Sequence, residues 1–169
     1  MTETEERGSE GAPATTDSIE TGLRALICED EPLTVLLLER TLRNAGIQVV
    51  GKAKEGQAGI ELARATRPDF VLMDINMPGM SGIEATRRLT AEHPLPIIML
   101  TAYGDVEHVD EAIEAGACAY LVKPIAHADL IPAIRRAIAL FETCQALDDQ
   151  YRSVGSGEPS QSGAASPVQ

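Results

Sequence analysis

The sequence predicts an α/β domain in which helices cover both faces of a five-stranded, doubly wound parallel sheet. Short apolar runs rich in Val, Ile and Leu alternate five times with longer amphipathic segments. The runs are five or six residues long, which is typical of strands buried on both faces. Aromatic residues make up only 3% of the chain, so the core has to be aliphatic. Such alternation gives right-handed crossovers and a ligand site at the carboxyl ends of the strands.

The predicted strands are the five apolar runs themselves. The runs are LRALIC, IQVVGK, DFVLMD, PIIMLT and CAYLV, and all five are expected to be buried on both faces. The five runs occupy residues 23–28, 47–52, 69–74, 96–101 and 118–122.

The segments between the runs are predicted helices. Gly46 and Gly116 stand where C-terminal caps belong, and Ser81 stands where an N-cap belongs. Pro68 and Pro94 prevent the second and third helices from continuing. The last helix carries an apolar stripe made of Leu130, Ile134, Ile138 and Phe141. The helices are expected within residues 33–46, 55–68, 81–94, 105–116 and 127–144.

The two ends of the chain differ in composition from this body. Residues 1–22 hold six acidic side chains against one Arg and no apolar periodicity, which predicts a disordered acidic arm. Residues 23–142 form the predicted domain. Residues 143–169 are expected to extend the last helix and then to form a disordered tail rich in Gly, Ser and Pro.

Charge and composition argue against several classes of protein. A net charge of -12 repels phosphate backbones, so direct binding to nucleic acid is not expected. No apolar run approaches the roughly 18 residues of a membrane span, and the acidic N-terminus is unlike a leader peptide. A cytoplasmic protein without membrane contact is expected. The three cysteines have no CxxC spacing and are interpreted as buried structural thiols.

Unusual polar residues follow four of the predicted strands. Glu29 and Asp30 follow the first strand, Asp74 ends the third, Thr101 ends the fourth, and Lys123 follows the fifth. The carboxyl ends of parallel strands meet at one edge of the sheet, so these side chains are expected to lie together. Each alone has an ordinary interpretation, as a solvated loop, a helix start or a surface lysine. Their joint placement favours a site.

The residue types in this set indicate phosphoryl chemistry with a divalent cation. Carboxylates held close together raise one another's pKa unless a cation compensates their charge, and Mg²⁺ prefers such oxygen ligands. An Asp in this setting can act as a nucleophile toward a phosphoryl donor. Lys123 and the Thr101 hydroxyl would then contact phosphoryl oxygens.

These motifs together resemble the receiver domain of bacterial response regulators. The resemblance runs from Leu23 to about Phe141 and rests on CEDEP at 28–32, VLMDINMPGMSG at 71–82, MLTAY at 99–103 and AGACAYLVKPI at 115–125. It implies the flavodoxin-like strand order 2-1-3-4-5.

The resemblance also implies roles for individual residues. Asp74 would accept a phosphoryl group from a histidine kinase, a histidine phosphotransfer protein or a small-molecule donor. Asp30 would bind Mg²⁺ directly and Glu29 through water, while Asp74 and the backbone carbonyl of Asn76 complete the ligands. The family more often has Asp at the position of Glu29. Lys123 would contact the phosphoryl group.

The resemblance further implies a conformational switch. Thr101 would move toward the phosphoryl group, and the Tyr120 ring would turn inward behind it. The Lys123–Pro124 peptide bond is expected to be cis. The residues at Asn76 and Tyr103 vary in the family and influence how long the phosphoryl group survives.

The expected output is binding to another protein. A single-domain response regulator of a two-component or phosphorelay system would signal through the face made by the last two helices and the fifth strand, and it could form a homodimer on phosphorylation. The chain is expected to dephosphorylate itself slowly and not to be a turnover enzyme. A haloacid-dehalogenase-type phosphatase needs a second Asp where Asn76 stands. The alternative is a receiver-fold interaction module that works without phosphorylation.

Overall fold

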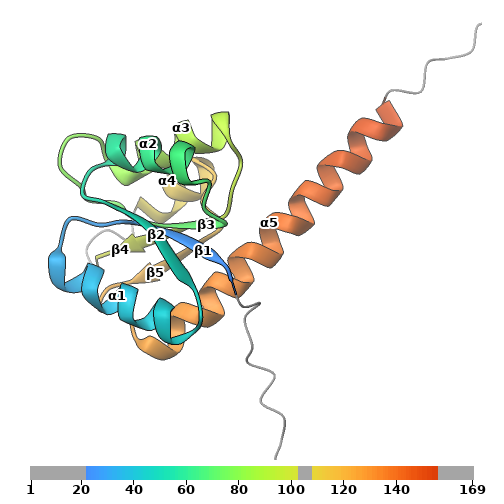
Figure 1. Cartoon of the computed structure of the whole chain (residues 1–169). Coiled ribbons are helices and arrows are strands. Elements are labelled where there is room, and N and C mark those ends of the chain that lie inside the picture. The colour runs from blue at the N-terminus through green and yellow to red at the C-terminus, as the bar shows by residue number, and fades with distance from the viewer. Residues whose placement is uncertain (1–21, 103–107, 156–169) are drawn as a thin grey trace, which may run out of the picture.

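The computed structural model describes residues 22–102 and 108–155, and these residues contain one parallel sheet of five strands. The strands are ordered β2-β1-β3-β4-β5, which confirms the doubly wound, flavodoxin-like topology (Figure 1). Their bounds are β1 Arg24–Cys28, β2 Gln48–Ala53, β3 Phe70–Asp74, β4 Ile97–Thr101 and β5 Ala119–Val122.

Helices cover both faces of this sheet, as Figure 1 shows. The core on one face holds side chains of α1 and α5, and the core on the other face holds side chains of α2, α3 and α4. The helix bounds are α1 Pro32–Asn44, α2 Gly56–Thr66, α3 Gly82–Glu92, α4 Val109–Glu114 and α5 His127–Gly155.

The central strands divide their side chains between the two cores. In β1, Leu26 and Cys28 pack toward α2 and α3, whereas Ala25 and Ile27 pack toward α1 and α5. Every residue of β3 and β4 is buried. The expectation of burial on both faces is wrong for the edge strands β2 and β5, because each has a neighbouring strand on one side only and keeps partly exposed residues.

The predicted end signals are found at most helices. Gly46 and Gly116 have φ of 78° and 104°, in the region that glycine adopts without a steric penalty. The Ser81 hydroxyl accepts a hydrogen bond from the Glu84 backbone N–H at 3.3 Å, as an N-cap does. Arg67, which no end signal marks, ends α2 with φ of 46°.

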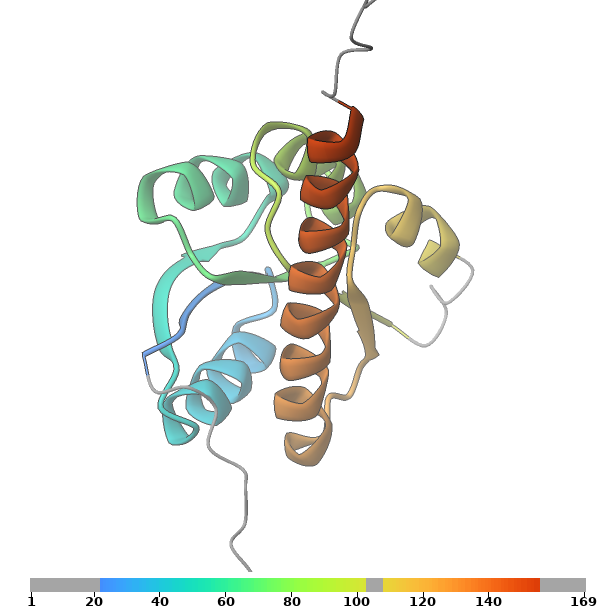
Figure 2. The same ribbon diagram turned by 90° about the vertical axis from the view of Figure 1, so that its right-hand side faces the viewer.

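The last helix continues past Cys144 into the residues that were expected to extend it, and it ends at Gly155. Its second half projects from the body (Figure 1), and the helix lies in front of the body in Figure 2. Cys28 is buried and Cys118 half-buried, but Cys144 is exposed on this projection, so the interpretation of all three as buried thiols is wrong for Cys144.

Part of what the sequence predicts lies outside the described residues. This part comprises the acidic arm up to residue 21, the tail from residue 156, the start of the fourth helix near Asp105, and Tyr103. Within 22–102 and 108–155, none of the helices combines the length and the apolar character needed to cross a membrane.

Candidate functional site

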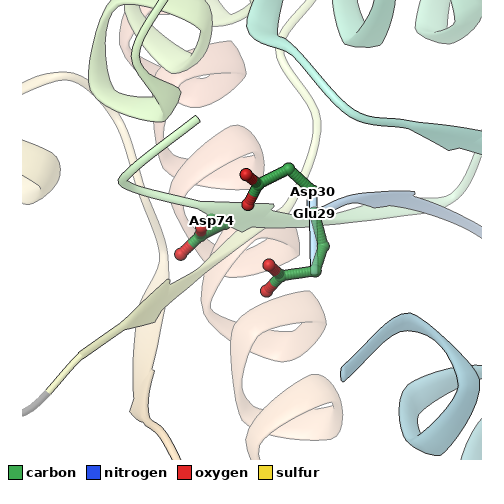
Figure 3. Close-up of side chains that lie close together, drawn as sticks. All are labelled: Glu29, Asp30 and Asp74. Atoms are coloured by element: carbon green, nitrogen blue, oxygen red, sulfur yellow. The ribbon is translucent and has the colours of Figure 1, made fainter. Parts of the chain in front are cut away.

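Three carboxylates meet at the carboxyl ends of β1 and β3. Glu29 and Asp30 directly follow β1, and Asp74 is the last residue of β3, the neighbouring parallel strand. One carboxylate oxygen from each of the three lies within 4.8 Å of the others (Figure 3). Glu29 and Asp74 are 1% and 3% exposed, while Asp30 is open to solvent. The predicted meeting of these residues at one edge is confirmed.

Lys123 directly follows β5, two strands away from β3, and its side chain contacts two of these carboxylates. Its Nζ lies 2.8 Å from Glu29 Oε2 and 3.0 Å from Asp74 Oδ1. Glu29 also accepts a hydrogen bond through Oε1 from the backbone N–H of Glu31 at 3.1 Å. Glu29 is thereby held on both oxygens, so the buried charge is paired and hydrogen-bonded.

The site perturbs the ionisation of Asp74. Burial raises the pKa of Asp74 from 3.8 to about 6, the hydrogen bond from Lys123 opposes this rise, and the charge of Glu29 adds to it. Burial alone would lower the pKa of Lys123, but its hydrogen bonds to Glu29 and Asp74 outweigh that effect and raise it. Lys123 therefore stays charged beside a carboxylate that is unusually easy to protonate.

Thr101 ends β4 next to Asp74 and is fully buried. Its hydroxyl donates to the carbonyl of Ala102 at 3.1 Å, and its own carbonyl accepts the backbone N–H of Lys123 at 2.7 Å. The ends of β4 and β5 are thus tied together behind the carboxylates. The peptide bond between Lys123 and Pro124 is cis, as expected.

Tyr120 lies on β5, one strand further from the carboxylates. It is 46% exposed, so its ring points outward in this structure. Asn76 lies in the loop after β3, two residues beyond Asp74, and its side chain is exposed.

Gly82 lies against the backbone of Asp74, a contact that the motif alone does not reveal. A Cβ atom there would collide with the backbone carbonyl of Asp74, and the Gly82 N–H donates to the carbonyl of Ile75 at 2.9 Å. The first residue of α3 therefore lies directly against the peptide that carries Asp74. The sequence shows a glycine suited to a turn, but the close approach depends on how α3 packs back onto β3.

An apolar surface borders the site on the α1 side. Leu33, Leu36 and Leu37 are 62%, 61% and 56% exposed on the first half of α1. A groove of about 100 Å³ lies between α1 and the loop after β5, and both Leu37 and Lys123 line it. Sequence periodicity could not show that these leucines stay uncovered, because they look like core positions in an apolar helix.

The donor set suits a hard divalent cation. Three carboxylate oxygens within 4.8 Å, one of the groups exposed, match the oxygen ligands and open water positions that Mg²⁺ favours. Such a cation would also offset the mutual repulsion that contributes to the raised pKa of Asp74.

Comparison with known proteins assigns the class. A family model described as the response regulator receiver domain matches residues 25–135. The chain therefore belongs to the receiver family of two-component response regulators.

Individual relatives agree with this assignment. The transcriptional regulatory protein PdtaR of Mycobacterium tuberculosis is 42% identical over 131 residues, which cover 78% of this chain and 64% of that protein. A protein-glutamate methylesterase/protein-glutamine glutaminase of Natronomonas pharaonis is 40% identical over 61% of this chain and 30% of that enzyme. This chain thus spans less than two thirds of the length of either relative.

A solved structure shows the same fold. The signal receiver domain of a modulated diguanylate cyclase from Desulfovibrio desulfuricans G20 matches with a TM-score of 0.66 and 35% identity. The match covers 71% of this chain and 96% of that one.

Proposed function

We propose that this protein is a phosphorylation-dependent response regulator that accepts a phosphoryl group on Asp74. One observation carries the proposal: the Asp74 carboxylate is buried, yet it is paired with Lys123 at 3.0 Å and faces two further carboxylates. An ion pair with a purely structural role needs only one carboxylate beside the lysine. Here two further carboxylates lie close by, and together the three could bind a cation.

Glu29, Asp30, Asp74 and the backbone carbonyl of Asn76 would hold Mg²⁺. The bound ion would supply positive charge against the oxygens of the incoming phosphoryl group. Asp30 is the exposed member of the set and is suited to direct ligation, whereas Glu29 keeps one oxygen on Lys123 and is suited to a contact through water.

The transfer itself needs one nucleophile and one leaving group. An oxygen of ionised Asp74 attacks phosphorus, the bond from phosphorus to the donor atom breaks, and the bonding electron pair leaves with the donor. Lys123 Nζ, now 3.0 Å from Asp74 Oδ1, would move onto a phosphoryl oxygen. The Thr101 hydroxyl, bonded to a loop carbonyl in this structure, would exchange that acceptor for a phosphoryl oxygen.

The acyl phosphate would shift the protein toward a second conformation. The phosphoryl group carries about -1.5 to -2 charge in place of the single negative charge of ionised Asp74, and it brings three acceptor oxygens. Movement of Thr101 toward them would draw the outward Tyr120 ring in behind it and change the face made by α4, β5 and α5. A downstream protein would read that face, with homodimer formation as a further outcome.

The phosphoryl donor is expected to dock at the mouth of the site. Leu33, Leu36 and Leu37 offer an apolar surface beside the groove that contains Lys123, which suits a histidine kinase or a histidine phosphotransfer protein. In this proposal residues 23–142 are the receiver, hydrolysis of the acyl phosphate is slow, and the protein acts in the cytoplasm.

The alternative is an interaction module that uses the receiver fold without phosphorylation. Incubation with acetyl phosphate and Mg²⁺, followed by intact-mass measurement, separates the two. The proposal predicts a gain of one phosphoryl unit that EDTA prevents and that Asp74→Asn abolishes.

The control is Asp110→Asn, which removes an exposed carboxylate on α4 outside the site and should leave the gain unchanged. Absence of the adduct with acetyl phosphate and also with a transferring kinase, while Mg²⁺ binds, would favour the interaction module.

A further inference from the structure

Two glycines on one face of α2 are buried. Gly56 is the first residue of the helix, and Gly59 stands three positions later, where side chains share a face. Alanine stabilises a helix relative to glycine by up to about 1 kcal/mol, so two glycines on a buried face lower the stability of the helix. A glycine inside a helix usually has a packing reason. Here each glycine allows a close contact with a segment that carries proposed Mg²⁺ ligands.

Gly56 lies against the loop of residues 75–81, which joins β3 to α3 and carries Asn76. A Cβ atom at Gly56 would come 2.7 Å from the carbonyl oxygen of Met80 and 3.0 Å from the Met80 Cβ. The Gly56 N–H donates a hydrogen bond to the same carbonyl at 3.3 Å. Backbone therefore lies on backbone at this point, and the start of α2 determines where the loop lies.

Gly59 lies against the end of β1. A Cβ atom at Gly59 would come 2.7 Å from the Sγ of Cys28, which is fully buried. Cys28 directly precedes Glu29. The backbone N–H of Glu29 donates to the carbonyl of Ala53 at 2.9 Å, and Ala53 ends the strand that leads into α2. The segment that carries Glu29 is thus held by β2 and α2 together.

We propose that α2 is a spacer that sets the separation between the two ligand-bearing segments, with Gly56 and Gly59 as positioning residues. The inference rests on the proposed Mg²⁺ site, and neither glycine has a side chain to offer as a ligand. Supporting contacts of this kind matter to metal sites, since their loss commonly weakens metal binding by about 10–100-fold. Asp74 and Thr101 end central strands, so a change in α2 should alter Mg²⁺ binding more than the reactivity of Asp74.

Calorimetric titration of the full chain with Mg²⁺ tests the spacing. We expect Gly56→Ala to weaken Mg²⁺ binding by about tenfold, because the new methyl group displaces Met80 and the loop with it. Circular dichroism checks that the variant is folded. Phosphorylation by acetyl phosphate gives a second readout. The Mg²⁺ concentration at half-maximal rate should rise, whereas the maximal rate at saturating Mg²⁺ should change little.

Gly51→Ala is the matched control. It makes the same substitution in β2, where the added methyl group would meet the ends of the Leu26 and Leu62 side chains and no ligand-bearing segment. It should leave the Mg²⁺ affinity unchanged, whatever its effect on the free energy of unfolding.

The Gly59 contact can be tested by rescue. Burial raises the pKa of the Cys28 thiol to about 12, so this thiol acts as a small apolar group and can be replaced by alanine. Gly59→Ala should weaken Mg²⁺ binding, and adding Cys28→Ala should restore it, because removal of the Sγ leaves room for the new methyl group. Restored metal affinity separates a positioning role from a general loss of stability.

An unchanged Mg²⁺ affinity in folded Gly56→Ala would overturn the proposal, and so would a loss in Gly59→Ala that Cys28→Ala does not restore. If Gly56→Ala does not fold, the rescue pair decides. A wild-type chain that binds no Mg²⁺ would overturn the proposed function together with the spacer. A wild-type chain that binds Mg²⁺ no better than the variants would overturn the spacer alone.

Discussion

The surroundings of Asp74 have opposing effects on its ionisation. Burial and the nearby charge of Glu29 disfavour the carboxylate, whereas the paired Lys123 favours it. Asp74 is 3% exposed, with Lys123 Nζ at 3.0 Å and the Glu29 carboxylate close by. The pKa of about 6 says that the unfavourable contributions are the larger ones when no cation is bound. A reactive arrangement of this kind costs stability, which is typical of functional sites.

This cost can be measured by removing the charge of Asp74, which should increase the free energy of unfolding by an amount that depends on pH. The pKa of Asp74 is raised in the folded protein, so ionised Asp74 opposes folding fully above pH 6 and not at all below its unfolded value near 3.8. In EDTA at pH 8, Asp74→Asn should increase the free energy of unfolding by about 2–3 kcal/mol. The gain should shrink as the pH falls from about 6 to about 4.

Urea denaturation of the wild type and the variant at several pH values measures this difference. Asp110→Asn serves as the control again, with a change within about 0.5 kcal/mol expected for an exposed site. A loss of stability in Asp74→Asn at pH 8 would show that the pairing with Lys123 outweighs burial and repulsion.

At the scale of elements, the site depends on how α3 returns to β3. Gly82 begins α3 against the Asp74 carbonyl, and Ser81 caps the helix one residue earlier. The loop between the strand and this contact carries Asn76, whose carbonyl belongs to the proposed ligand set. The contact between α3 and the end of β3 thus fixes both ends of the loop that carries Asn76.

Gly82→Ala tests this contact, because helix propensity and the local geometry predict opposite changes in the stability of the protein. Alanine normally stabilises a helix relative to glycine by up to about 1 kcal/mol. Here the added methyl group meets the Asp74 backbone, so we expect the variant to lose about 1–3 kcal/mol of stability and to bind Mg²⁺ more weakly. Thermal unfolding and a Mg²⁺ titration measure the two effects, and an unchanged or higher stability would contradict the contact.

The elements differ in how well the sequence predicted them. β3 and β4 are unbroken apolar runs, and Ser81 and Gly116 are strong end signals, so their bounds match closely. The edge strands were expected to be buried on both faces because their apolar runs resemble those of the central strands. The extension of α5 beyond Cys144 was expected, but its end at Gly155 was not, because the exposed residues after Cys144 carry no burial pattern that would mark it.

At the scale of the whole molecule, the candidate site was predictable because parallel topology brings strand ends to one edge. Glu29, Asp74 and Lys123 are far apart in sequence, yet the strand order alone places them together. The pairing of Lys123 with both carboxylates and the outward Tyr120 ring required the side-chain positions. The exposure of the second half of α5 likewise depends on where the body of the domain stops.

The central claim is that Asp74 itself carries the phosphoryl group. Borohydride reduces an aspartyl phosphate to homoserine, so it marks the modified residue permanently. After acetyl phosphate and Mg²⁺ treatment and reduction, peptide mass analysis should find homoserine at position 74 and no such conversion at Glu29 or Asp30. Conversion at another acidic residue, or an intact-mass adduct with position 74 unchanged, would contradict the account.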